Sequence, residues 1–478
     1  FSFEYDKFKI NLKNVDSLRL KVPSKELDDY GNYKLVKVKT VIEHIDGELL
    51  IDQPYNKSGV KPFPEYPIFH SFKDSYVFYD RNSIQNSVYD KDKFYFHLEP
   101  FSIDSLDNFN PASISLKGNF VSAGIFPDFI DSLGVQPDYS LGFVRPTPPG
   151  GFPAYGGKGT YSANINLSHR GLRGDGTLNY LVSTTTSDDF IFFPDSMNTN
   201  AQHFKIENQA GPIEYPDVIA DSAYIQWLPY QDVMYVHKEQ RDMNLYDGEA
   251  MMGGTLALQP GGLTGDGQID FAGAELESDL IKFNQWTFDA DTSDFRMGTE
   301  ISELEAFSTV NVNAHVDFDK RKGMFKSNGG GSYIEFPINQ YICYMDQFTW
   351  YMDEGSIELS VSEAETARMT SNELQLEGAK FISTHPKQDS LSFYAVKGKY
   401  DLKTNIINAE EVKLINVADA RIYPDAGKVT IRKKANMEML TFAKILANTT
   451  TQYHNIYNAE VKINSRKHYA GSGDYDYI

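Results

Sequence analysis

Apolar and polar residues alternate along most of this chain in short segments. Clear examples are the run Phe94, Phe96 and Leu98 and the pair Leu178 and Tyr180. Because successive side chains of a β-strand point to opposite faces of a sheet, such alternation indicates strands with one buried face. Helical spacing favours only two short segments, residues 127–133 and 437–446, and the second fits a strand equally well. The sequence therefore predicts an all-β protein.

Two segments rich in glycine or proline interrupt the alternation. The run Arg145-Pro146-Thr147-Pro148-Pro149-Gly150-Gly151-Phe152-Pro153 continues to Gly156-Gly157. Proline cannot donate to a sheet ladder, so this run predicts a linker between domains. The second segment, residues 327–332, is closely flanked by strand patterns and predicts a long hairpin turn.

A repeat of 91 residues is visible in the middle of the chain. Residues 171–180 match residues 262–271, and both begin with Gly-Leu and contain Gly-Asp-Gly. The glycines predict a positive-φ turn between one strand and the next. Two further pairs support the match, namely Ser187-Asp188 with Ser278-Asp279 and Gly159-Thr160 with Gly254-Thr255.

A looser repeat fills the last hundred residues. Tyr400, Tyr423 and Tyr453 follow one another at intervals of 23 and 30 residues, each beside short alternating segments. Periods in the twenties are typical of stacked solenoid rungs, although a compact sandwich also gives short, evenly spaced strands. We predict an elongated, repeat-containing body of stacked β-sheet, solenoid-like or taco-like, with a separate N-terminal β region. The predicted divisions are 1–144, the linker 145–158, the repeat region 159–379 and a basic region 380–478.

Charge narrows the range of partners. The 478 residues carry 45 Lys+Arg and 66 Asp+Glu, a net charge of −21, which repels nucleic-acid phosphates. No stretch approaches the roughly 20 apolar residues of a transmembrane helix. We therefore predict neither nucleic acid as a partner nor a transmembrane segment.

The C-terminal region differs from the rest in charge. Residues 380–478 hold 15 Lys+Arg against 10 Asp+Glu, a net +5, which leaves −26 for residues 1–379. The densest clusters are candidates for contact with anionic headgroups or an acidic partner. The alternative is that they are solvated strand edges that block aggregation. The candidates are Arg432, Lys433, Lys434, Arg466 and Lys467.

Catalytic motifs are missing from the sequence. The histidines show no His-Glu-x-x-His spacing, and neither a Gly-x-Ser-x-Gly elbow nor a phosphate-binding loop occurs. The one cysteine, Cys343, lies in an apolar run and is expected to be a small buried side chain. We predict no catalytic residue, no metal and no cofactor, and a protein that is not an enzyme.

Three other features have a simpler interpretation than a binding site. Asp289, Asp291 and Asp294 resemble a calcium loop in composition only, because the central glycine and closing glutamate are missing. The tripeptide 173–175, Arg-Gly-Asp, loses its arginine in the second copy, where Thr264 takes that place. Trp227, Trp286 and Trp350 could stack on sugars but fall on strand patterns, and are first expected in the core.

Two C-terminal segments resemble a known family. Residues 393–409, with Tyr-Asp followed by alternating apolar residues that end in alanine, resemble the rung of the OstA family of lipopolysaccharide-transport periplasmic proteins, and residues 420–431 look like the next rung. Related bridge proteins of the AsmA/TamB type are similar in principle. The Asp-, Asn- and Tyr-rich segments 89–96 and 339–346 resemble envelope proteins of Bacteroidota.

This resemblance implies a non-enzymatic, extracytoplasmic component of the bacterial envelope, in the periplasm or at the outer membrane and cell surface. It would be structural, or would conduct lipid or lipopolysaccharide along an apolar groove, and it would contact other envelope proteins. The alternative is that the same residues form a closed, dry core. The residues expected on this inner face are Val310, Val312, Val316, Phe318, Val412, Leu414, Ile422, Val429 and Ile431.

Two other functions fit the sequence. A cell-surface module that binds glycans or proteins would show exposed aromatic platforms at its loops, and a polysaccharide-active enzyme would need two carboxylates within about 5–10 Å. Because the sequence starts at Phe1, without an initiating methionine, it is expected to be a processed protein or part of a longer chain or assembly.

Overall fold

The computed structural model describes residues 1–476 apart from 32, 57, 108–109, 299–304, 330–332, 345, 362–377, 449 and 452. Strands make up 60% of the chain and helical turns 5%, and 34 strands belong to one antiparallel sheet. The all-β prediction is confirmed. The first segment with helical spacing lies mostly in β11, which corrects that interpretation, and the second lies mostly in β38 and β39, as its alternative interpretation predicted. Of the part of the chain that the structure describes, no helix is both long and apolar enough to span a membrane.

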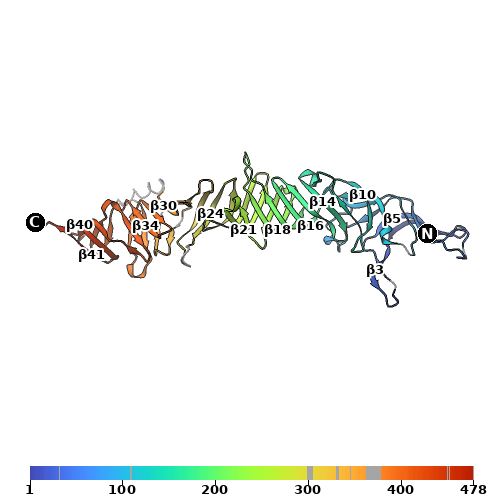
Figure 1. Ribbon diagram of the computed structural model, residues 1–478, viewed down its shortest axis with the longest axis horizontal. Coiled ribbons are helices and arrows are strands. Elements are labelled where there is room, and N and C mark those ends of the chain that lie inside the picture. Colours follow the sequence, from blue (N-terminus) through green and yellow to red (C-terminus); the bar gives the residue numbers. More distant parts are fainter. Residues whose placement is uncertain are drawn as a thin grey trace. The chain divides into compact units, whose positions relative to one another are not determined.

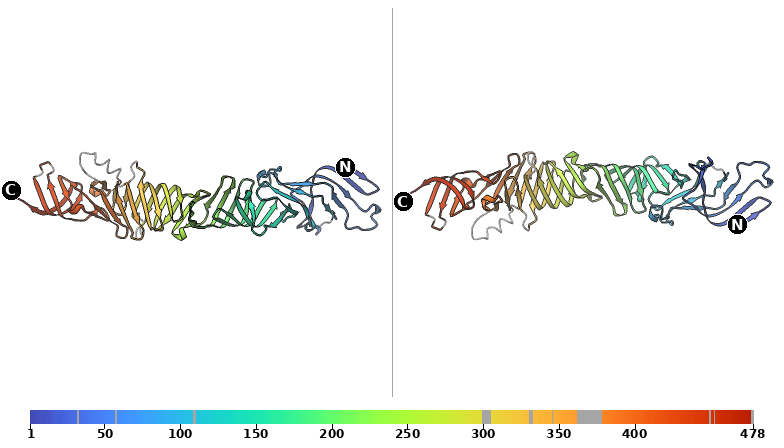
Figure 2. Two further views of the ribbon diagram at one scale, coloured as in Figure 1. Left: turned by 90° about the horizontal axis from the view of Figure 1, so that it is seen from above. Right: turned by 90° about the horizontal axis from the view of Figure 1, so that it is seen from below.

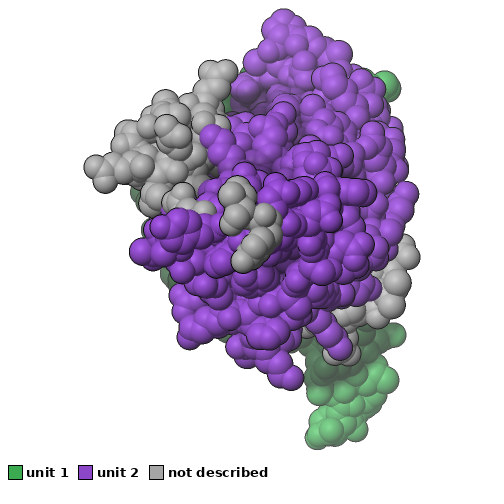
Figure 3. All heavy atoms as spheres, turned by 90° about the vertical axis from the view of Figure 1, so that its left-hand side faces the viewer, with its two compact units in different colours: residues 1–205, 221–240 green, residues 206–220, 241–478 purple. Residues whose placement is uncertain are grey.

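The chain divides into two compact units (Figure 3). Unit 1 contains residues 1–205 and 221–240, and unit 2 contains residues 206–220 and 241–478. This division falls inside the predicted repeat region and not at residue 145. Each unit is described by itself below.

Unit 1 is an antiparallel sheet in which many strands pair with a neighbour in sequence, whereas β2 pairs with β5, β6 with β9 and β8 with β10. A two-stranded hairpin, β3–β4, lies beside it (Figure 1). Short 3-10 turns connect some strands: η1 (Gln85–Ser87), η2 (Pro111–Ser113), η3 (Tyr155–Gly157) and η4 (Pro229–Gln231). Its strands are β1 (Ser2–Glu4), β2 (Lys9–Leu18), β3 (Lys21–Leu27), β4 (Tyr33–Lys37), β5 (Ile42–Leu50), β6 (Ile68–Ser71), β7 (Ser75–Phe78), β8 (Phe94–Leu98), β9 (Ser102–Ile103), β10 (Leu116–Ser122), β11 (Phe129–Val135), β12 (Leu141–Pro146), β13 (Phe152–Ala154), β14 (Gly159–Ser168), β15 (Gly171–Tyr180), β16 (Ser183–Phe192) and β19 (Val233–Lys238), with most of β17 (Met197–Ile206) and of β18 (Val218–Leu228).

Unit 2 continues with long strands and then with many short ones (Figure 2). Its 3-10 turns are η5 (Tyr246–Gly248), η6 (Pro386–Gln388) and η7 (Asp425–Gly427). Its strands are β20 (Met243–Leu245), β21 (Ala250–Gln259), β22 (Gly262–Phe271), β23 (Ala274–Phe283), β24 (Thr287–Met297), β25 (Phe307–Asp317), β26 (Lys322–Ser327), β27 (Ile334–Phe336), β28 (Tyr341–Cys343), β29 (Gln347–Tyr351), β30 (Ser356–Ser360), β31 (Ala379–Ser383), β32 (Ser392–Ala395), β33 (Lys397–Asp401), β34 (Ile406–Glu410), β35 (Ile415–Val417), β36 (Ala420–Tyr423), β37 (Val429–Arg432), β38 (Asn436–Met437), β39 (Leu440–Ala447), β40 (His454–Ser465) and β41 (His468–Tyr475).

The 91-residue repeat is a repeat of strands. Adding 91 to the bounds of β13, η3, β14, β15 and β16 gives those of β20, η5, β21, β22 and β23. We call residues 152–206 copy 1 and residues 243–297 copy 2. One predicted pairing was wrong by four positions, because Gly159 corresponds to Ala250, whereas Gly254 corresponds to Ala163.

The Gly-Asp-Gly segments lie inside strands and not in turns between them, which corrects the prediction. Gly176 (φ 133°) pairs with Ala163 (φ 102°), and Gly267 (φ 126°) pairs with Gly254 (φ 143°). At the same place the register with the next strand shifts, between Gly174 and Gly176 in copy 1. Such a bulge with positive φ bends a strand sharply. The strands β14, β15, β21 and β22 are therefore each bent near their middle.

In unit 2 the strands after β25 form two ladders. Residues Val312 to Asp317 of β25 pair with β26, whereas Ser308 and Thr309 pair with β27. One ladder continues through β29, β30, β33, β34, β37 and β38, and the other through β28, β31 and β32. At an offset of 91, β28 and β29 together replace the single strand β21. A bent long strand thus becomes two short ones, and all pairings are antiparallel, unlike those of a parallel β-helix.

The predicted linker, residues 145–158, is part of the sheet. β12 pairs with one half of β14, through Phe143 and Leu167, and β13 pairs with the other half, through Phe152 and Tyr161. The proline- and glycine-rich residues between them form a connecting turn, where no ladder N–H is required. The second glycine-rich segment, predicted as a hairpin turn, lies partly outside the described residues, at 330–332.

Candidate functional site

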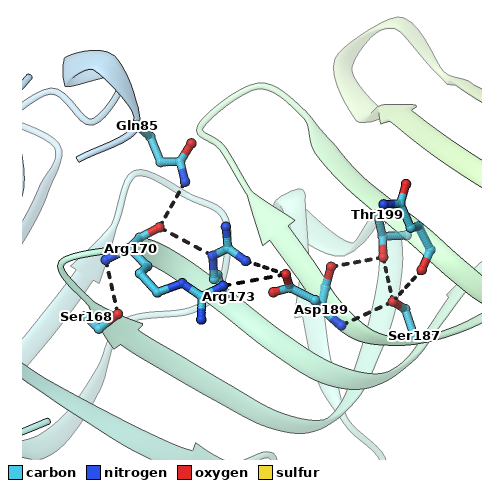
Figure 4. Close-up of polar contacts among 8 residues, drawn as sticks. Gln85, Ser168, Arg170, Arg173, Ser187, Asp189 and Thr199 are labelled. Atoms are coloured by element: carbon cyan, nitrogen blue, oxygen red, sulfur yellow. Dashed lines mark hydrogen bonds and ion pairs between the residues drawn. The ribbon is translucent and has the colours of Figure 1, made fainter. Parts of the chain in front are cut away.

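The turn between β14 and β15 carries a cluster of charged side chains (Figure 4). Arg173 is ion-paired with Asp189, and Arg170 lies 3.8 Å from the same carboxylate. The Nε of Arg173 donates to the carbonyl of Arg170 at 3.4 Å. We call residues 168–173 with 187–196 turn site 1.

Hydroxyl groups fix the backbone beneath these charges (Figure 4). Ser187 Oγ accepts from the amide of Asp189 at 3.2 Å and from Thr199 Oγ1 at 2.7 Å, and it donates to the carbonyl of Asn200 at 3.0 Å. Ser168 Oγ accepts from the amide of Arg170 at 3.1 Å. The backbone of Asp189, from which its carboxylate projects, is therefore fixed by hydroxyl groups of β16 and β17.

A tyrosine from a distant segment covers turn site 1. The hydroxyl of Tyr89 donates to the carbonyl of Phe192 at 2.8 Å and accepts from the amide of Leu172 at 3.1 Å. Its ring stacks on Phe94 with centroids 4.2 Å apart, and burial raises the pKa of Tyr89 to about 12. Gln85 adds a bond from Nε2 to the carbonyl of Arg170 at 3.0 Å. Turn site 1 is thus filled by the chain's own residues 85–89.

The Arg-Gly-Asp tripeptide lies within strand β15 of this cluster. The Arg173 side chain is largely covered and paired with Asp189, and Asp175 accepts from Asn164 Nδ2 at 3.1 Å. Integrin-type recognition needs both side chains presented by a protruding loop, so the interpretation as a chance match agrees with this placement.

The same position in copy 2 has a different cover, in which the buried Tyr215 of the loop 207–217 lies at the turn in place of residues 85–89. Turn site 2, residues 259–264 with 278–287, has Thr264 in place of Arg173 and Leu280 in place of Asp189. A Cβ built on Gly171 would lie 2.7 Å from the Tyr89 hydroxyl. A Cβ built on Gly262 would have no heavy atom of the described residues within 4 Å. The charged cluster and its cover are both specific to copy 1.

A cleft of about 760 Å³ occupies turn site 2. One wall is the loop between β17 and β18, residues 207–217, and the other consists of the ends of β21 to β24. Tyr215 Oη donates to the carbonyl of Gln259 at 2.6 Å, and Gln285 binds Glu214 and Asn208 at 3.2 and 2.7 Å, so the loop is fixed. The cleft is lined by Pro212, Ile213, Glu214, Gln259, Gly261, Gly262, Leu263, Thr264, Lys282, Phe283, Asn284 and Thr287.

The structure separates the residues predicted for an apolar inner face. Val310 is 47% exposed, which corrects its predicted orientation. Asn311 has φ 55°, and the register of β24 with β25 shifts there, so alternation reverses its phase before Val312. Leu414 is half-buried. The buried residues are Val312, Val316, Phe318, Val412, Ile422, Val429 and Ile431.

Three of the five basic candidates have acidic neighbours within the chain. Arg432 pairs with Glu438, and Arg466 and Lys467 lie 3.0 and 3.1 Å from Asp389. These two cations lower the pKa of the Asp389 carboxyl. Lys434 donates its backbone amide to Ile338 at 3.0 Å, and Lys433 is its neighbour in the same turn. The basic end therefore already neutralises part of its charge.

The other singled-out side chains are placed as follows. Cys343, Trp227 and Trp350 are buried, whereas Trp286 is half-buried in the turn before β24. His315 Nδ1 lies 2.6 Å from the carboxylate of Asp289, and Asp294 accepts from the amide of Asn311. Among the residues with a described position, no three His, Cys, Asp or Glu side chains are grouped to hold a metal ion.

Carboxylates do gather in a second cleft, of about 500 Å³, at the turn between β22 and β23. Glu249, Asp270, Glu275 and Glu305 line it together with Arg296. Two of these acids are held in ion pairs, Glu275 with Arg296 at 3.6 Å and Glu249 with Arg321. A glycosidase needs two carboxyl groups presented to the substrate, whereas these two are engaged by arginine side chains of the chain itself.

Sequence reasoning missed both the cover of turn site 1 and the cleft at turn site 2. Tyr89 lies 83 residues from Leu172 and 103 from Phe192, and no periodicity links such distant positions. The available signal was the repeat itself, because comparing Arg173 with Thr264 already showed that the two copies differ at this turn.

Comparison with known proteins adds no relative. No family model matches the chain, no curated protein matches it, and no solved structure matches it.

Proposed function

We propose that this chain is a non-enzymatic structural β-scaffold of the bacterial cell envelope, with a closed apolar interior. The observation that carries the proposal is the burial of Val312, Val316, Val429 and Ile431, all at most 2% exposed. In the described part of the chain these side chains are covered by other side chains of the protein. A face that passes acyl chains along its length would have to be reached from outside.

Tyrosine hydrogen bonds that recur in both copies support a scaffold. Tyr155 Oη donates to the carbonyl of Ser196 at 2.6 Å, and Tyr246 Oη donates to that of Thr287 at 2.8 Å, at the offset of 91. Both rings are buried, and burial raises the pKa of both phenols. Because the same buried hydrogen bond recurs in successive copies, it favours a rigid body made of stacked units.

The envelope assignment rests on resemblance and chemistry. Residues 393–409 form β33, β34 and the strand before them, which resemble the OstA rung, and their tyrosine Tyr400 is buried against Phe336. From that resemblance we also propose an extracytoplasmic location and other envelope proteins as partners. In this proposal the basic residues Arg466 and Lys467 form ion pairs with Asp389, which stabilise the last sheet, and they do not bind a lipid headgroup.

Lipid analysis tests the proposal. The purified protein is extracted with organic solvent and examined by native and lipid mass spectrometry. We expect no lipid at a defined stoichiometry, and we expect Val316→Asp to unfold the region around β25, because a buried unpaired charge is strongly destabilising. Met324→Asp, on the exposed face of the paired strand β26, is the matched control and should fold normally.

One result of the lipid analysis would contradict the scaffold proposal. Stoichiometric phospholipid or lipopolysaccharide that is lost in a folded Val316→Asp or Val429→Asp variant would replace the scaffold by a lipid conduit.

A further inference from the structure

The hairpin formed by β3 and β4 is a candidate interaction surface. Among the described residues it is a two-stranded sheet of its own, and Figure 1 shows it projecting from unit 1. Two strands alone are marginally stable in water, and an open strand edge is a template for pairing with another chain. The hairpin also exposes apolar side chains, since Leu27 is 54%, Tyr33 63% and Leu35 64% exposed.

The direction of the backbone groups shows which edge of the hairpin is open. The amide of Val38 donates to the carbonyl of Leu20 at 2.8 Å. Because hydrogen-bonded and non-hydrogen-bonded pairs alternate along an antiparallel ladder, Lys37 and Leu35 direct their N–H and C=O groups outward from β4. The outward position of β3 opposite Leu35 is Pro23, which has no N–H. Proline therefore blunts the edge of β3, and the edge of β4 stays open.

The chain itself uses the next position along the edge of β4. The amide of Lys39 donates to the carbonyl of Tyr139 at 2.9 Å. This bond lies just beyond β4, so the open part of the edge is β4 itself, Tyr33–Lys37. A partner strand therefore has five residues with which to pair.

Charge changes sign along the hairpin. The turn at its tip contains Asp28 and Asp29, whereas its base carries the exposed lysines Lys21, Lys37 and Lys39. If β4 of a second copy pairs antiparallel with β4, the acidic tip of each hairpin lies beside the basic base of the other. The hairpin is thus complementary in charge to a second copy of itself.

One antiparallel register also suits the side chains of β4. When Leu35 lies opposite Leu35 of the second copy, Tyr33 lies opposite Lys37 and Lys34 lies opposite Val36. No like charges are then directly opposite, and the stem of Lys37 can pack on the tyrosine ring.

The two neighbouring registers fit less well. A register centred on Lys34 sets two lysines directly opposite each other, which is destabilising. A register centred on Val36 pairs Tyr33 with Lys39, whose amide is already bonded within the chain. The register centred on Leu35 is therefore the favoured one.

We propose that two copies of this chain associate through β4, whose open edges pair antiparallel about a two-fold axis at Leu35. The two hairpins then form one four-stranded sheet. This interaction surface goes beyond the scaffold role, because a closed apolar interior requires no contact at the hairpin. One pair of five-residue strands is a small interface, so the dimer is weak and depends on protein concentration.

Cysteine crosslinking of the full chain tests the register. The one native cysteine, Cys343, is buried, so a cysteine introduced in the hairpin supplies the exposed thiol. In a hydrogen-bonded antiparallel pair the Cα atoms lie about 5.5 Å apart, a distance that a disulfide spans. During oxidation with diamide, Leu35→Cys should form a disulfide-linked dimer about tenfold faster than Leu27→Cys at equal concentration.

Leu27→Cys is a matched control for this experiment. Leu27 is an exposed leucine of the same hairpin, but it lies on β3. The two β3 strands of the four-stranded sheet lie three strand spacings apart, about 14 Å, which a disulfide cannot span.

Sedimentation equilibrium tests the reversible dimer. Up to about 0.5 mM, the wild-type chain should show concentration-dependent dimerisation. Leu35→Lys sets two lysines opposite each other at the axis and should weaken the dimer by about fivefold or more. Leu27→Lys makes the same change of charge on β3 and should not weaken it. An equal mixture of Leu35→Lys and Leu35→Glu should restore association, because opposite charges then face each other.

A second pair of cysteines covers the case that Leu35→Cys lowers the thermal midpoint of unfolding. The favoured register places Tyr33 opposite Lys37, so a mixture of Tyr33→Cys and Lys37→Cys chains should crosslink faster than either variant alone.

Three results would overturn the proposal. They are equal crosslinking of Leu35→Cys and Leu27→Cys, equal association of Leu35→Lys and the wild-type chain, or a wild-type chain that stays monomeric throughout the concentration range. A monomer would leave the edge of β4 to a strand of another protein. None of these results depends on the lipid content of the protein, so the scaffold proposal stands or falls separately.

Discussion

Turn sites 1 and 2 have the same backbone and different covers. Strand bounds, bends and the buried tyrosine hydrogen bonds recur at an offset of 91 residues. Copy 1 adds the charged residues Arg170, Arg173 and Asp189 and the inserted Tyr89, whereas copy 2 has a cleft. The strand bounds, the bends and the tyrosine hydrogen bonds are repeated, whereas side chains near one end of the strands and the segments that cover that end differ. The repeated framework is therefore carried by the strands, and variation between the copies is concentrated at one end of them and in the connecting segments.

The largest test of this comparison is Tyr89→Ala. It removes a fully buried ring, its stacking on Phe94 and two backbone hydrogen bonds, so the free energy of unfolding should fall by about 3–5 kcal/mol. Urea unfolding followed by circular dichroism measures the loss. Tyr230→Ala, at a tyrosine 58% exposed, should cost less than about 1 kcal/mol. Equal losses would show that turn site 1 does not depend on its cover.

Alkaline pH tests the same tyrosine without truncating it. The pKa of Tyr89 is raised by burial from 10.0 to about 12, so folding favours the protonated phenol. Its stabilisation is complete below pH 10 and is lost as pH rises from 10 to 12, by up to about 3 kcal/mol at 1.36 kcal/mol per pKa unit. Urea midpoints at pH 9 and 12 measure this. Tyr89→Phe should show a smaller loss between the two, and an unchanged loss would contradict a buried phenol.

The strand bends should respond alike in both copies. Gly176→Ala and Gly267→Ala each place a Cβ 2.2 Å from a carbonyl oxygen at positive φ and should each cost about 1–3 kcal/mol. Gly261→Ala meets open space in the described structure and should be close to neutral. Thermal unfolding of the three variants measures the difference. A neutral Gly267→Ala would mean that copy 2 is not bent as copy 1 is.

The buried tyrosine hydroxyls Tyr155 and Tyr246 should have smaller effects of similar size in the two copies. Tyr155→Phe and Tyr246→Phe leave a buried carbonyl without its phenol donor, at Ser196 and Thr287 respectively. Each should lose about 1–2 kcal/mol, since only a hydrogen bond is removed. Tyr155 also donates to the carbonyl of Phe193, so its loss should be the larger of the two if they differ. Urea unfolding measures both losses of stability. A larger loss for Tyr246→Phe than for Tyr155→Phe would argue against equivalent roles for the two tyrosines.

The charged cluster of copy 1 should contribute least. Arg170→Gln removes an exposed ion pair with a 3.8 Å separation and should change stability by less than about 0.5 kcal/mol. Arg173→Gln removes a pair with a largely covered arginine and should cost about 1 kcal/mol. Unfolding at low and high salt separates the two, because salt screens mainly the exposed pair. A larger loss of stability for Arg170→Gln than for Arg173→Gln would show that the Arg170 pair, and not the Arg173 pair, contributes more.

Much of the fold could be predicted from the sequence. Alternation gave the strands, and the match of residues 171–180 with 262–271 gave the repeat, because both are local patterns. The direction of Val310 could not be predicted, since one bulge at Asn311 reverses every later position of the alternation. The proline-rich run 145–158 was misassigned for a related reason, because its turn joins two strands that pair with the same neighbour, β14.

The candidate site was less predictable. The inner-face residues Val429 and Ile431 could be identified as buried, but a buried face and a lipid-lined face have the same sequence pattern. The cover of turn site 1 depends on Tyr89, whose contacts are long-range, and the cleft of turn site 2 depends on where the loop 207–217 folds. Both are decided by tertiary packing, and only the difference between Arg173 and Thr264 hinted at them.

Hydrogen exchange at the two turn sites tests the central comparison most directly. Backbone amides of residues 171–173 and 262–264, followed by mass spectrometry on peptides that cover each segment, report how well each site is covered from solvent. The account predicts exchange at least about tenfold slower at 171–173 than at 262–264, and acceleration at 171–173 alone in Tyr89→Ala. Equal rates in the wild-type chain would contradict the claim that the two copies differ in how their turns are covered.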